Sequence, residues 1–225
     1  MKNINGFKKS DIVIGLVFTL LFISLGVIFT INFRPLYYLD IKLLSIPEIS
    51  GYPRNEIIAN YNALIDYSSP FFRGSLSFPT LISSPSGIQH FKEVKDIFVL
   101  FYGLAGFSLI AAVTIIIYKS RKKDISYLAA ASLSTIILPI IVGLLIAIDF
   151  DAAFSLFHKL FFKNDYWLFD PATDPVITIL PDTFFLHCAL LIIIFVLICS
   201  LISFLLYRHL KGRYRSDYNK QSAQL

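Results

Sequence analysis

Four long stretches of this chain contain no Asp, Glu, Lys or Arg, and they limit its possible folds more than any other feature. They cover residues 12–33, 97–118, 125–148 and 183–207 and are 22 to 25 residues long. A helix needs about 20 apolar residues to cross a bilayer core of about 30 Å, and an isolated apolar segment in lipid must pair its own backbone groups. The sequence therefore predicts an all-α integral membrane protein with four transmembrane helices.

The charged residues predict how these helices are oriented. The N-terminus, the short loop 119–124 and the tail 208–225 together carry 12 basic and three acidic residues, whereas segments 34–96 and 149–182 carry 8 basic and 12 acidic residues. Because basic residues concentrate in cytoplasmic loops, both termini and the short loop are expected in the cytoplasm. The basic excess lies at membrane edges, which argues against a nucleic-acid partner.

The two longer segments are expected on the extracellular side, where they form a compact, partly helical cap. Within them the pattern predicts a helix over 55–67 and an aromatic amphipathic stretch over 154–162, and Asp182 is expected to cap the fourth membrane helix. The first apolar stretch is interpreted as an uncleaved anchor, and the tail after Arg208 as a cytoplasmic extension without regular structure. The whole chain, 1–225, is thus predicted to be a single membrane domain.

His90 is the first candidate for chemistry. Ser86 and Gln89 match a capping box, which would begin a helix at Ser86 and place His90 just after its first turn. A helix N-terminus disfavours another positive charge, so this imidazole is expected to stay neutral. Glu93 follows on the same face and can orient the ring. The alternative is an interfacial histidine without a role.

His158 is the second candidate, because it is the polar position of the aromatic stretch 154–162. A dense polar and aromatic cluster follows it, and ionisable groups near a membrane are expensive and commonly functional. This cluster contains Asn164, Asp165, Trp167 and Asp170. The Asp-Pro pair at Asp170 can also be a plain turn.

His187 lies about one turn into the fourth predicted membrane helix. It either joins a site or forms a hydrogen bond with a neighbouring helix. His209 lies in the basic tail and is expected to be solvated. Cys188 and Cys199 lie at lipid depth, where packing is the more common role. Three outer histidines near Asp residues can bind zinc, but no spacing here is diagnostic of a metal site.

Familiar catalytic signatures are missing from the sequence. It contains no G-x-S-x-G elbow, H-E-x-x-H motif, P-loop or dinucleotide-binding fingerprint. If the protein catalyses acyl transfer, the nucleophile need not come from the protein itself.

Three segments resemble the bacterial lipoprotein intramolecular transacylases, the Lit family. They are SGIQHFKEVK at 86–95, FHKLFFKNDYWLFDP at 157–171 with its continuation to 185, and the region 55–67. The resemblance extends over the whole chain in size and predicted topology. Glu93 is a departure, because the family pattern has Asp at that position; the charge is kept on a longer side chain.

This resemblance implies a four-helix membrane enzyme with an extracellular cap and no cofactor. Such enzymes act on lipoproteins whose N-terminal cysteine carries a diacylglyceryl thioether and a free α-amine. They move the sn-2 acyl chain onto that amine, which gives a lyso-form lipoprotein. The nucleophile is then the substrate's own amine, in keeping with the missing serine or cysteine motif.

Under this hypothesis, one of His90 and His158 deprotonates the ammonium and the other protonates the leaving glyceryl oxygen; the sequence does not assign the two roles. Further side chains are expected to stabilise the oxyanion or orient a histidine, namely Tyr61, Glu93, Lys95, Asn164, Asp165, Trp167 and Asp170.

Two other functions fit the same residues. A membrane lipid hydrolase, possible with or without zinc, would use the same histidines on a lipid ester. A non-enzymatic envelope sensor would tolerate loss of both histidines and depend on the apolar surface of the cap.

Overall fold

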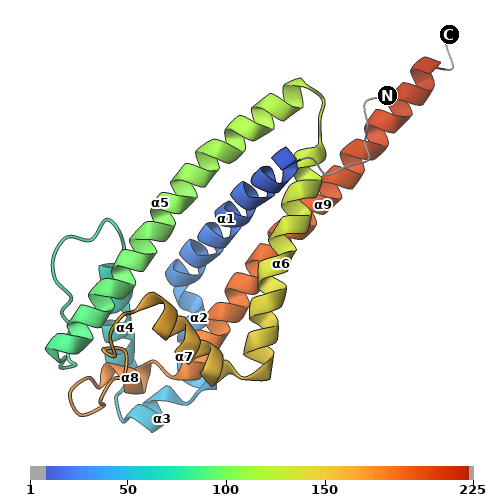
Figure 1. Ribbon diagram of the computed structural model, residues 1–225. Helices are drawn as coiled ribbons and strands as arrows, with labels where there is room; N and C mark the ends of the chain where they lie inside the picture. Colours follow the sequence, from blue (N-terminus) through green and yellow to red (C-terminus); the bar gives the residue numbers. More distant parts are fainter. Residues whose placement is uncertain (1–8, 223–225) are drawn as a thin grey trace. The chain divides into compact units, whose positions relative to one another are not determined.

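A computed structural model describes residues 9–222, with side chains described over 10–215. This part of the chain contains helices and no strand, as Figure 1 shows, so the predicted all-α class is confirmed. In chain order the helices are α1 (Lys9–Asn32), α2 (Arg34–Leu43), α3 (Ile46–Ser50), α4 (Arg54–Ser68), α5 (Pro85–Arg121), α6 (Ser126–Ile148), α7 (Phe150–Phe161), α8 (Val176–Ile179) and α9 (Asp182–Ser222).

Four helices are long and apolar enough to cross a membrane. They are α1, α5, α6 and α9, whose most apolar windows have mean hydropathies of 2.3 to 3.2. Only 17–33% of each window is buried within the protein. Apolar side chains that the rest of the protein does not cover need an apolar environment, and the lipid bilayer supplies it. The four predicted transmembrane helices are therefore confirmed.

Two of these helices are longer than the apolar stretches within them. Helix α5 begins at Pro85, well before residue 97, and α9 continues through Ser222. The expectation of an irregular tail is therefore wrong for residues 208–222. The physical reason is that adding residues to an existing helix is cheap, and the tail's Lys and Arg residues are good helix formers.

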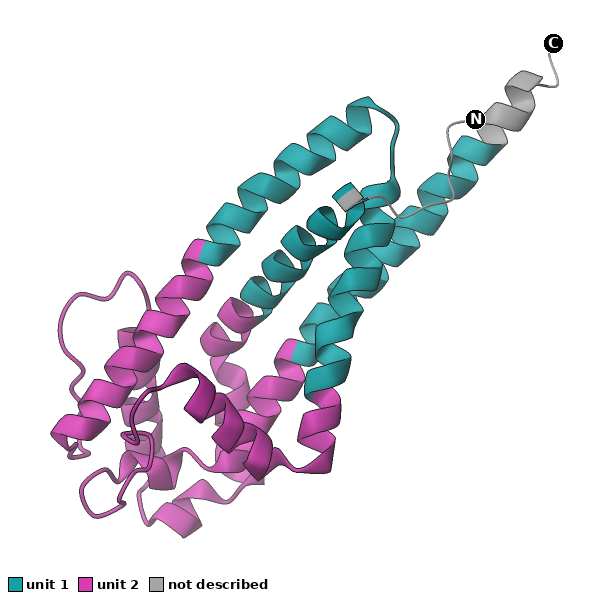
Figure 2. Cartoon of the chain, viewed as in Figure 1, with its two compact units in different colours: residues 1–26, 104–142, 193–225 teal, residues 27–103, 143–192 magenta. Residues whose placement is uncertain are grey.

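The chain divides into two compact units, coloured separately in Figure 2. Unit 1 comprises residues 1–26, 104–142 and 193–225; unit 2 comprises residues 27–103 and 143–192. The predicted single membrane domain stays a prediction.

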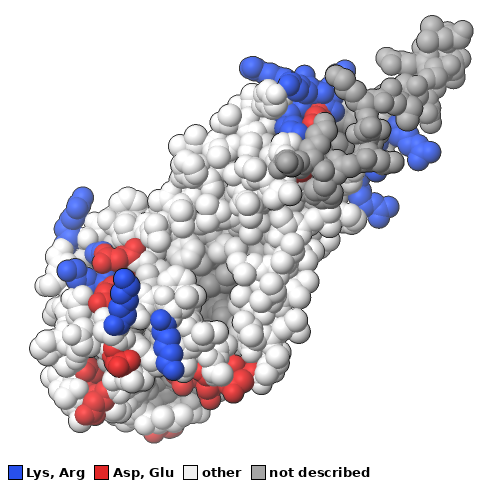
Figure 3. All heavy atoms as spheres, viewed as in Figure 1, with Lys and Arg blue, Asp and Glu red and all other residues white. Residues whose placement is uncertain are grey.

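Unit 1 contains parts of the four long helices, and small residues let two of them approach closely. A Cβ added at Gly15 of α1 would lie 2.6 Å from Ser134 Oγ of α6. Thr19 Oγ1 also donates a hydrogen bond to Ser134 Oγ at 3.2 Å. Close approach at small residues is the usual basis of helix packing in membranes. On the face shown in Figure 3, the charged atoms of this unit are mostly those of Lys and Arg.

Unit 2 contains the short helices and has a core rich in aromatic side chains. Tyr37 of α2 is fully buried, stacks on Tyr61 of α4 with ring centroids 3.7 Å apart, and donates a hydrogen bond to the Ile179 carbonyl at 2.6 Å. Burial raises the pKa of both tyrosine hydroxyls, so they stay neutral. The helix predicted over 55–67 corresponds to α4.

Candidate active site

His90 lies in the second turn of α5, and the cap of this helix differs from the expected one. The Gly87 backbone N–H donates to Ser84 Oγ at 2.9 Å, so Ser84 caps the helix and Pro85 follows in the first turn. Proline suits that position because its missing N–H has no helical partner there. The Gln89 side chain donates to Glu93 Oε1 at 3.0 Å instead of reaching back. The predicted capping box at Ser86 is therefore wrong, and the helix cap is Ser84, two residues earlier.

Asp174 packs against this helix start. Its Oδ1 accepts a hydrogen bond from the Ser84 backbone N–H at 2.8 Å, and its side chain is almost fully buried. An added Cβ at Gly87 would overlap Asp174 Oδ1 and lie 2.9 Å from its Cγ, so only glycine fits. A carboxylate near a helix N-terminus is also favourable. Asp174, like Asp170, precedes a proline and so resembles a turn residue in the sequence, which gives no sign of this contact.

His90 is enclosed by aromatic rings. It is 4% exposed, with the ring centroids of Phe162 and Phe169 at 4.7 and 5.5 Å. Its Nδ1 is buried without a hydrogen-bond partner in the described part of the chain. Glu93, expected to orient this ring, instead accepts hydrogen bonds from Gln89 and Asn164.

His158 lies on α7, and a backbone contact determines which nitrogen carries its proton. Nδ1 is 2.8 Å from the Phe154 carbonyl oxygen. A carbonyl only accepts, so Nδ1 is protonated and the lone pair of the neutral ring is on Nε2. Burial lowers the pKa of His158, against opposing contributions from the Phe154 carbonyl and the Asp182 carboxylate. The ring is thus held in a form that can accept a proton.

The structure brings His90 and His158 together although they are 68 positions apart. Their ring centroids are 6.0 Å apart, with an interplanar angle of 32°. Phe162 lies against both rings, at 4.7 Å from His90 and 5.6 Å from His158. Trp167 stacks on His158 at 4.7 Å.

An amide–carboxylate contact ties the two sides of this pair together. Asn164, just after α7, donates from Nδ2 to Glu93 at 3.1 and 3.2 Å. Glu93 is one turn after His90 on α5, and Asn164 is two residues after Phe162. The contact therefore holds the segment after α7 against α5.

Within residues 10–215, four other predicted site residues form no hydrogen bond, ion pair or ring contact with either histidine. Tyr61 packs on Tyr37 and Phe184. Lys95 donates to the Phe72 carbonyl at 3.2 Å and lies over the Tyr67 ring. The other two, Asp165 and Asp170, are exposed, and Asp170 Oδ1 accepts from the Ala172 N–H within a turn at 2.9 Å.

His187 of α9 pairs with a carboxylate that sequence reasoning missed. Its Nδ1 is 2.9 Å from both carboxylate oxygens of Asp40 on α2, and Asp40 is 1% exposed. Of the two alternatives for His187, the hydrogen bond to another helix is the one observed. No local sequence signal marks Asp40 as buried.

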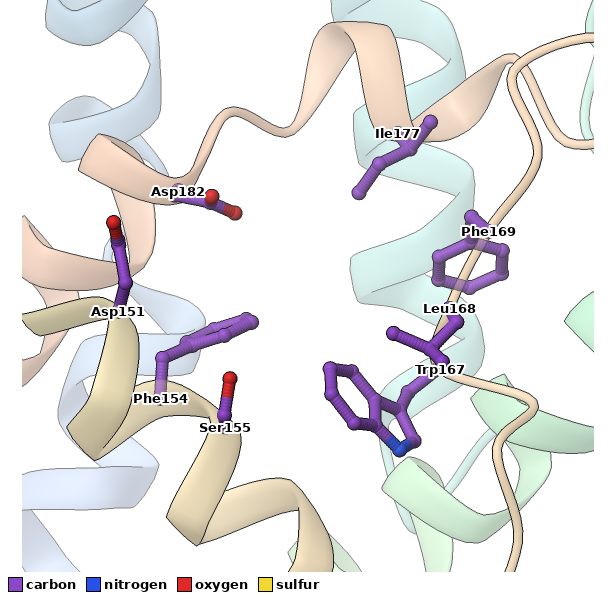
Figure 4. A pocket seen from close by; sticks show the side chains of 8 residues that line it. All are labelled: Asp151, Phe154, Ser155, Trp167, Leu168, Phe169, Ile177 and Asp182. Carbon is purple, nitrogen blue, oxygen red and sulfur yellow. The ribbon is translucent and has the colours of Figure 1, made fainter.

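Two pockets adjoin the histidine pair. One, of about 290 Å³, contains the rings of Phe154 and Trp167 next to His158, and Figure 4 shows both rings directed into it. The other, of about 410 Å³, is lined by Phe162 and by the Glu93 and Asn164 contact. The described residues contain no group of three His, Cys, Asp or Glu side chains suited to a metal ion.

The sequence matches the family described as lipoprotein intramolecular transacylase Lit over residues 12–185. The chain belongs to this family. It is also similar to a solved membrane-integral Lit of Bacillus cereus, at 41% identity and a TM-score of 0.88 over 92% of this chain and 98% of that one. No curated protein sequence matches the chain.

Two further structures of the Bacillus cereus Lit, each with one histidine replaced, are also similar to this chain. The arginine variant is 40% identical with a TM-score of 0.82, and the alanine variant 39% identical with a TM-score of 0.84. Each alignment covers 92% of this chain, and 95% and 94% of the respective variants. As a Lit protein, this chain is an integral membrane acyltransferase, and the resemblance inferred from its sequence is confirmed.

Proposed function

We propose that this chain moves the sn-2 acyl chain of an N-terminal S-diacylglyceryl cysteine onto that cysteine's own α-amino group. The bond between the acyl carbon and the glyceryl oxygen breaks, and a bond between the acyl carbon and the amine nitrogen forms. The observation that carries this proposal is the pair of buried histidines 6.0 Å apart in a chain of the Lit family. Such a pair suits proton transfer to and from a substrate that supplies its own nucleophile.

His158 is proposed as the general base. Its proton is on Nδ1, bound to the Phe154 carbonyl, so Nε2 is available to take a proton from the substrate ammonium. An α-amine has a pKa of about 7.7–8.0, so most of the substrate arrives protonated at neutral pH. Removing one proton exposes the lone pair that attacks the ester carbonyl.

His90 is proposed to pass a proton to the leaving glyceryl oxygen. The neutral amine carries two hydrogens; one remains in the amide product and the other is transferred to the glyceryl oxygen. His90 fits this role because its Nδ1 has no protein partner in the described structure, so the ring is not committed to a structural hydrogen bond. The proton taken earlier by His158 is released to solvent, which balances the reaction.

Asn164 is proposed to act through Glu93. Its amide, one of the side chains expected to stabilise the oxyanion or orient a histidine, already donates to Glu93. Tyr61 and Lys95 contact other groups. Much of the rate enhancement is therefore attributed to holding amine and ester together, an effect that can reach about 7–11 kcal/mol in well-oriented systems.

Unit 2 is proposed to lie on the extracellular side, with both termini in the cytoplasm and membrane lipids around the apolar helices. The support is the excess of basic residues on the opposite side of the four spans. Diacylated lipoproteins are anchored in that outer leaflet, so the ester and amine would meet the histidines without leaving the membrane surface.

The test is expression in a bacterium that makes diacylated lipoproteins, followed by tandem mass spectrometry of one lipoprotein's N-terminal peptide. Transfer predicts an acyl chain on the α-amine at unchanged total mass. Loss of a chain without N-acylation would point to the hydrolase, and an unmodified peptide to the non-enzymatic sensor. His209→Ala is the matched control for His90→Ala and His158→Ala, because His209 is exposed at the far end of α9.

A further inference from the structure

The pocket of about 290 Å³ beside His158 combines aromatic walls with two carboxylates. Figure 4 shows Asp151 and Asp182 on one side of it and Trp167 on the other, with the Phe154 ring directed inward. We propose that this pocket binds the α-ammonium group of the substrate cysteine, with Asp151 and Asp182 as counter-charges and Phe154 and Trp167 as aromatic walls. This inference rests on the proposed function and adds a recognition site for the free amine.

The aromatic walls place a bound cation next to the proposed base. Phe154 and Trp167 both line the pocket, and both lie against the His158 ring, with centroids at 4.2 and 4.7 Å. The face of an aromatic ring attracts ammonium groups, most strongly when the ring is tryptophan. An ammonium held in the pocket would therefore contact the same aromatic rings that contact His158, the proposed acceptor of its proton.

In the described structure, no hydrogen bond to another side chain occupies these carboxylates, although Asp182 also acts on His158 through its charge. Neither side chain, Asp151 or Asp182, makes a hydrogen bond or an ion pair with another side chain among residues 10–215, whereas neighbouring Asp149 accepts from the Ala152 N–H at 2.9 Å and caps α7. Asp151 is in the first turn of α7, and Asp182 begins α9. Negative charge is favourable near a helix N-terminus, which suits both positions.

The charge of this pocket distinguishes it from the other one. Among its lining residues Asp151 and Asp182 carry charge, and none is Lys, Arg or His. The larger pocket contains Lys163, and its Glu93 already accepts hydrogen bonds from Gln89 and Asn164. Of the two, the smaller pocket is the one suited to a cation.

Such a site would explain how substrate and product are distinguished. A free α-amine is mainly cationic at neutral pH, whereas the amide of an N-acylated cysteine carries no charge. Transfer would thus remove the charge that the pocket binds, which would promote product release. A lipoprotein that is already N-acylated would bind weakly for the same reason.

The experiment measures binding with lipopeptides that cannot react. Two dialkyl-ether analogues of the S-diacylglyceryl cysteine peptide are compared, one with a free α-amine and one N-acetylated. The wild-type protein in lipid nanodiscs should bind the free amine about tenfold more tightly, as expected for partly exposed hydrogen bonds to a charged group. In the double variant Asp151→Asn and Asp182→Asn the preference should disappear, so that the two peptides bind with about equal affinity. Binding of the N-acetylated peptide should be unchanged.

Glu48→Gln is the matched control, because Glu48 is an exposed carboxylate of unit 2 outside both pockets. It should keep the full preference for the free amine. A double variant that keeps the preference, or a wild-type protein that has none, would overturn the inference. If the wild-type protein also failed to transfer a chain from the diester peptide, the proposed function would fail instead, so the two failures are distinguishable.

Discussion

The two compact units differ in which polar side chains join separate elements: hydroxyl groups do so in unit 1, whereas carboxylates paired with a histidine or an amide do so in unit 2. In unit 1, Ser108 and Ser203 donate to carbonyls one turn back in their own helices, at 2.6 and 2.9 Å. In unit 2, the pairs His187 with Asp40 and Asn164 with Glu93 join different elements. Lipid cannot satisfy a polar group, so each hydroxyl of a membrane-crossing helix needs a partner in its own helix or in a neighbouring one, as Ser200 finds in the Ser132 carbonyl. A catalytic site requires polar side chains from several helices and loops at one place, and unit 2 contains such side chains.

The largest expected effect comes from removing a histidine of unit 2. His158→Ala should reduce the initial rate of acyl transfer by about 100- to 10,000-fold, the usual contribution of a general base. Ser200→Ala removes a buried hydrogen bond of unit 1, from Ser200 Oγ to the Ser132 carbonyl at 2.9 Å, and should leave the rate of the folded enzyme nearly unchanged. Quantitative mass spectrometry of N-acylated peptide measures both. Equal losses in the two variants would contradict the division between the units.

Lys119 of unit 1 is a buried cation that joins different elements through ion pairs. Its Nζ donates to Asp124 Oδ2 at 2.7 Å and to Ser126 Oγ at 3.0 Å, and it lies 3.8 Å from Asp11 Oδ1. Lys119→Met should lower the free energy of unfolding by about 3 kcal/mol, because two carboxylates lose a buried partner. Thermal unfolding in detergent measures this, with exposed Lys122→Met as the control. If Lys119→Met left the free energy of unfolding unchanged, the ion pairs would contribute little to stability.

Two glycines of α5 test how tightly the helix start is packed in unit 2. Gly87→Ala should cost about 1–3 kcal/mol, because its Cβ would overlap the Asp174 carboxylate. A Cβ added at Gly106, in unit 1, would meet nothing within 4 Å beyond its chain neighbours and the backbone of its own helix, so Gly106→Ala should stabilise the helix by up to about 1 kcal/mol. Unfolding curves of the two variants should therefore shift in opposite directions. Shifts in the same direction would mean that Asp174 moves aside.

The smallest expected effect is a shift in pH dependence. His158 must be neutral to accept a proton, and burial lowers its pKa from the ordinary value of about 6.5. Activity should therefore rise with pH through a midpoint below about 6.5. Asp182→Asn should move this midpoint lower still, because the carboxylate favours the imidazolium. A profile of kcat/KM against pH measures both, and a midpoint above the ordinary value would argue against His158 as the base.

The sequence predicts the membrane helices well because lipid imposes a simple rule on length and charge. It also singles out His158, because an ionisable group stands out in an aromatic stretch, and His90, because a helix start is predicted just before it. It does not reveal Asp174 or Asp40, because their burial depends on segments far away in the chain. The cap of α5 was misplaced because Ser84 and Ser86 flank Pro85 and both resemble a helix start. The individual roles of Tyr61, Lys95 and Asp165 stay predictions, and their observed contacts give them little support.

The continuity of helix α5 determines how far His90 lies from the apolar stretch that crosses the membrane. It is one unbroken helix of 37 residues, about 56 Å long, and the hydrocarbon core needs about 30 Å of it. His90 precedes the uncharged stretch at residue 97 by seven residues, a rise of about 10 Å. Because the helix is rigid, it keeps His90 at a fixed distance from the start of the apolar stretch. In the proposed orientation, with the hydrocarbon core beginning near residue 97, the imidazole would lie about 10 Å outside that core, at the level of the glyceryl ester of a lipoprotein whose acyl chains stay in the membrane.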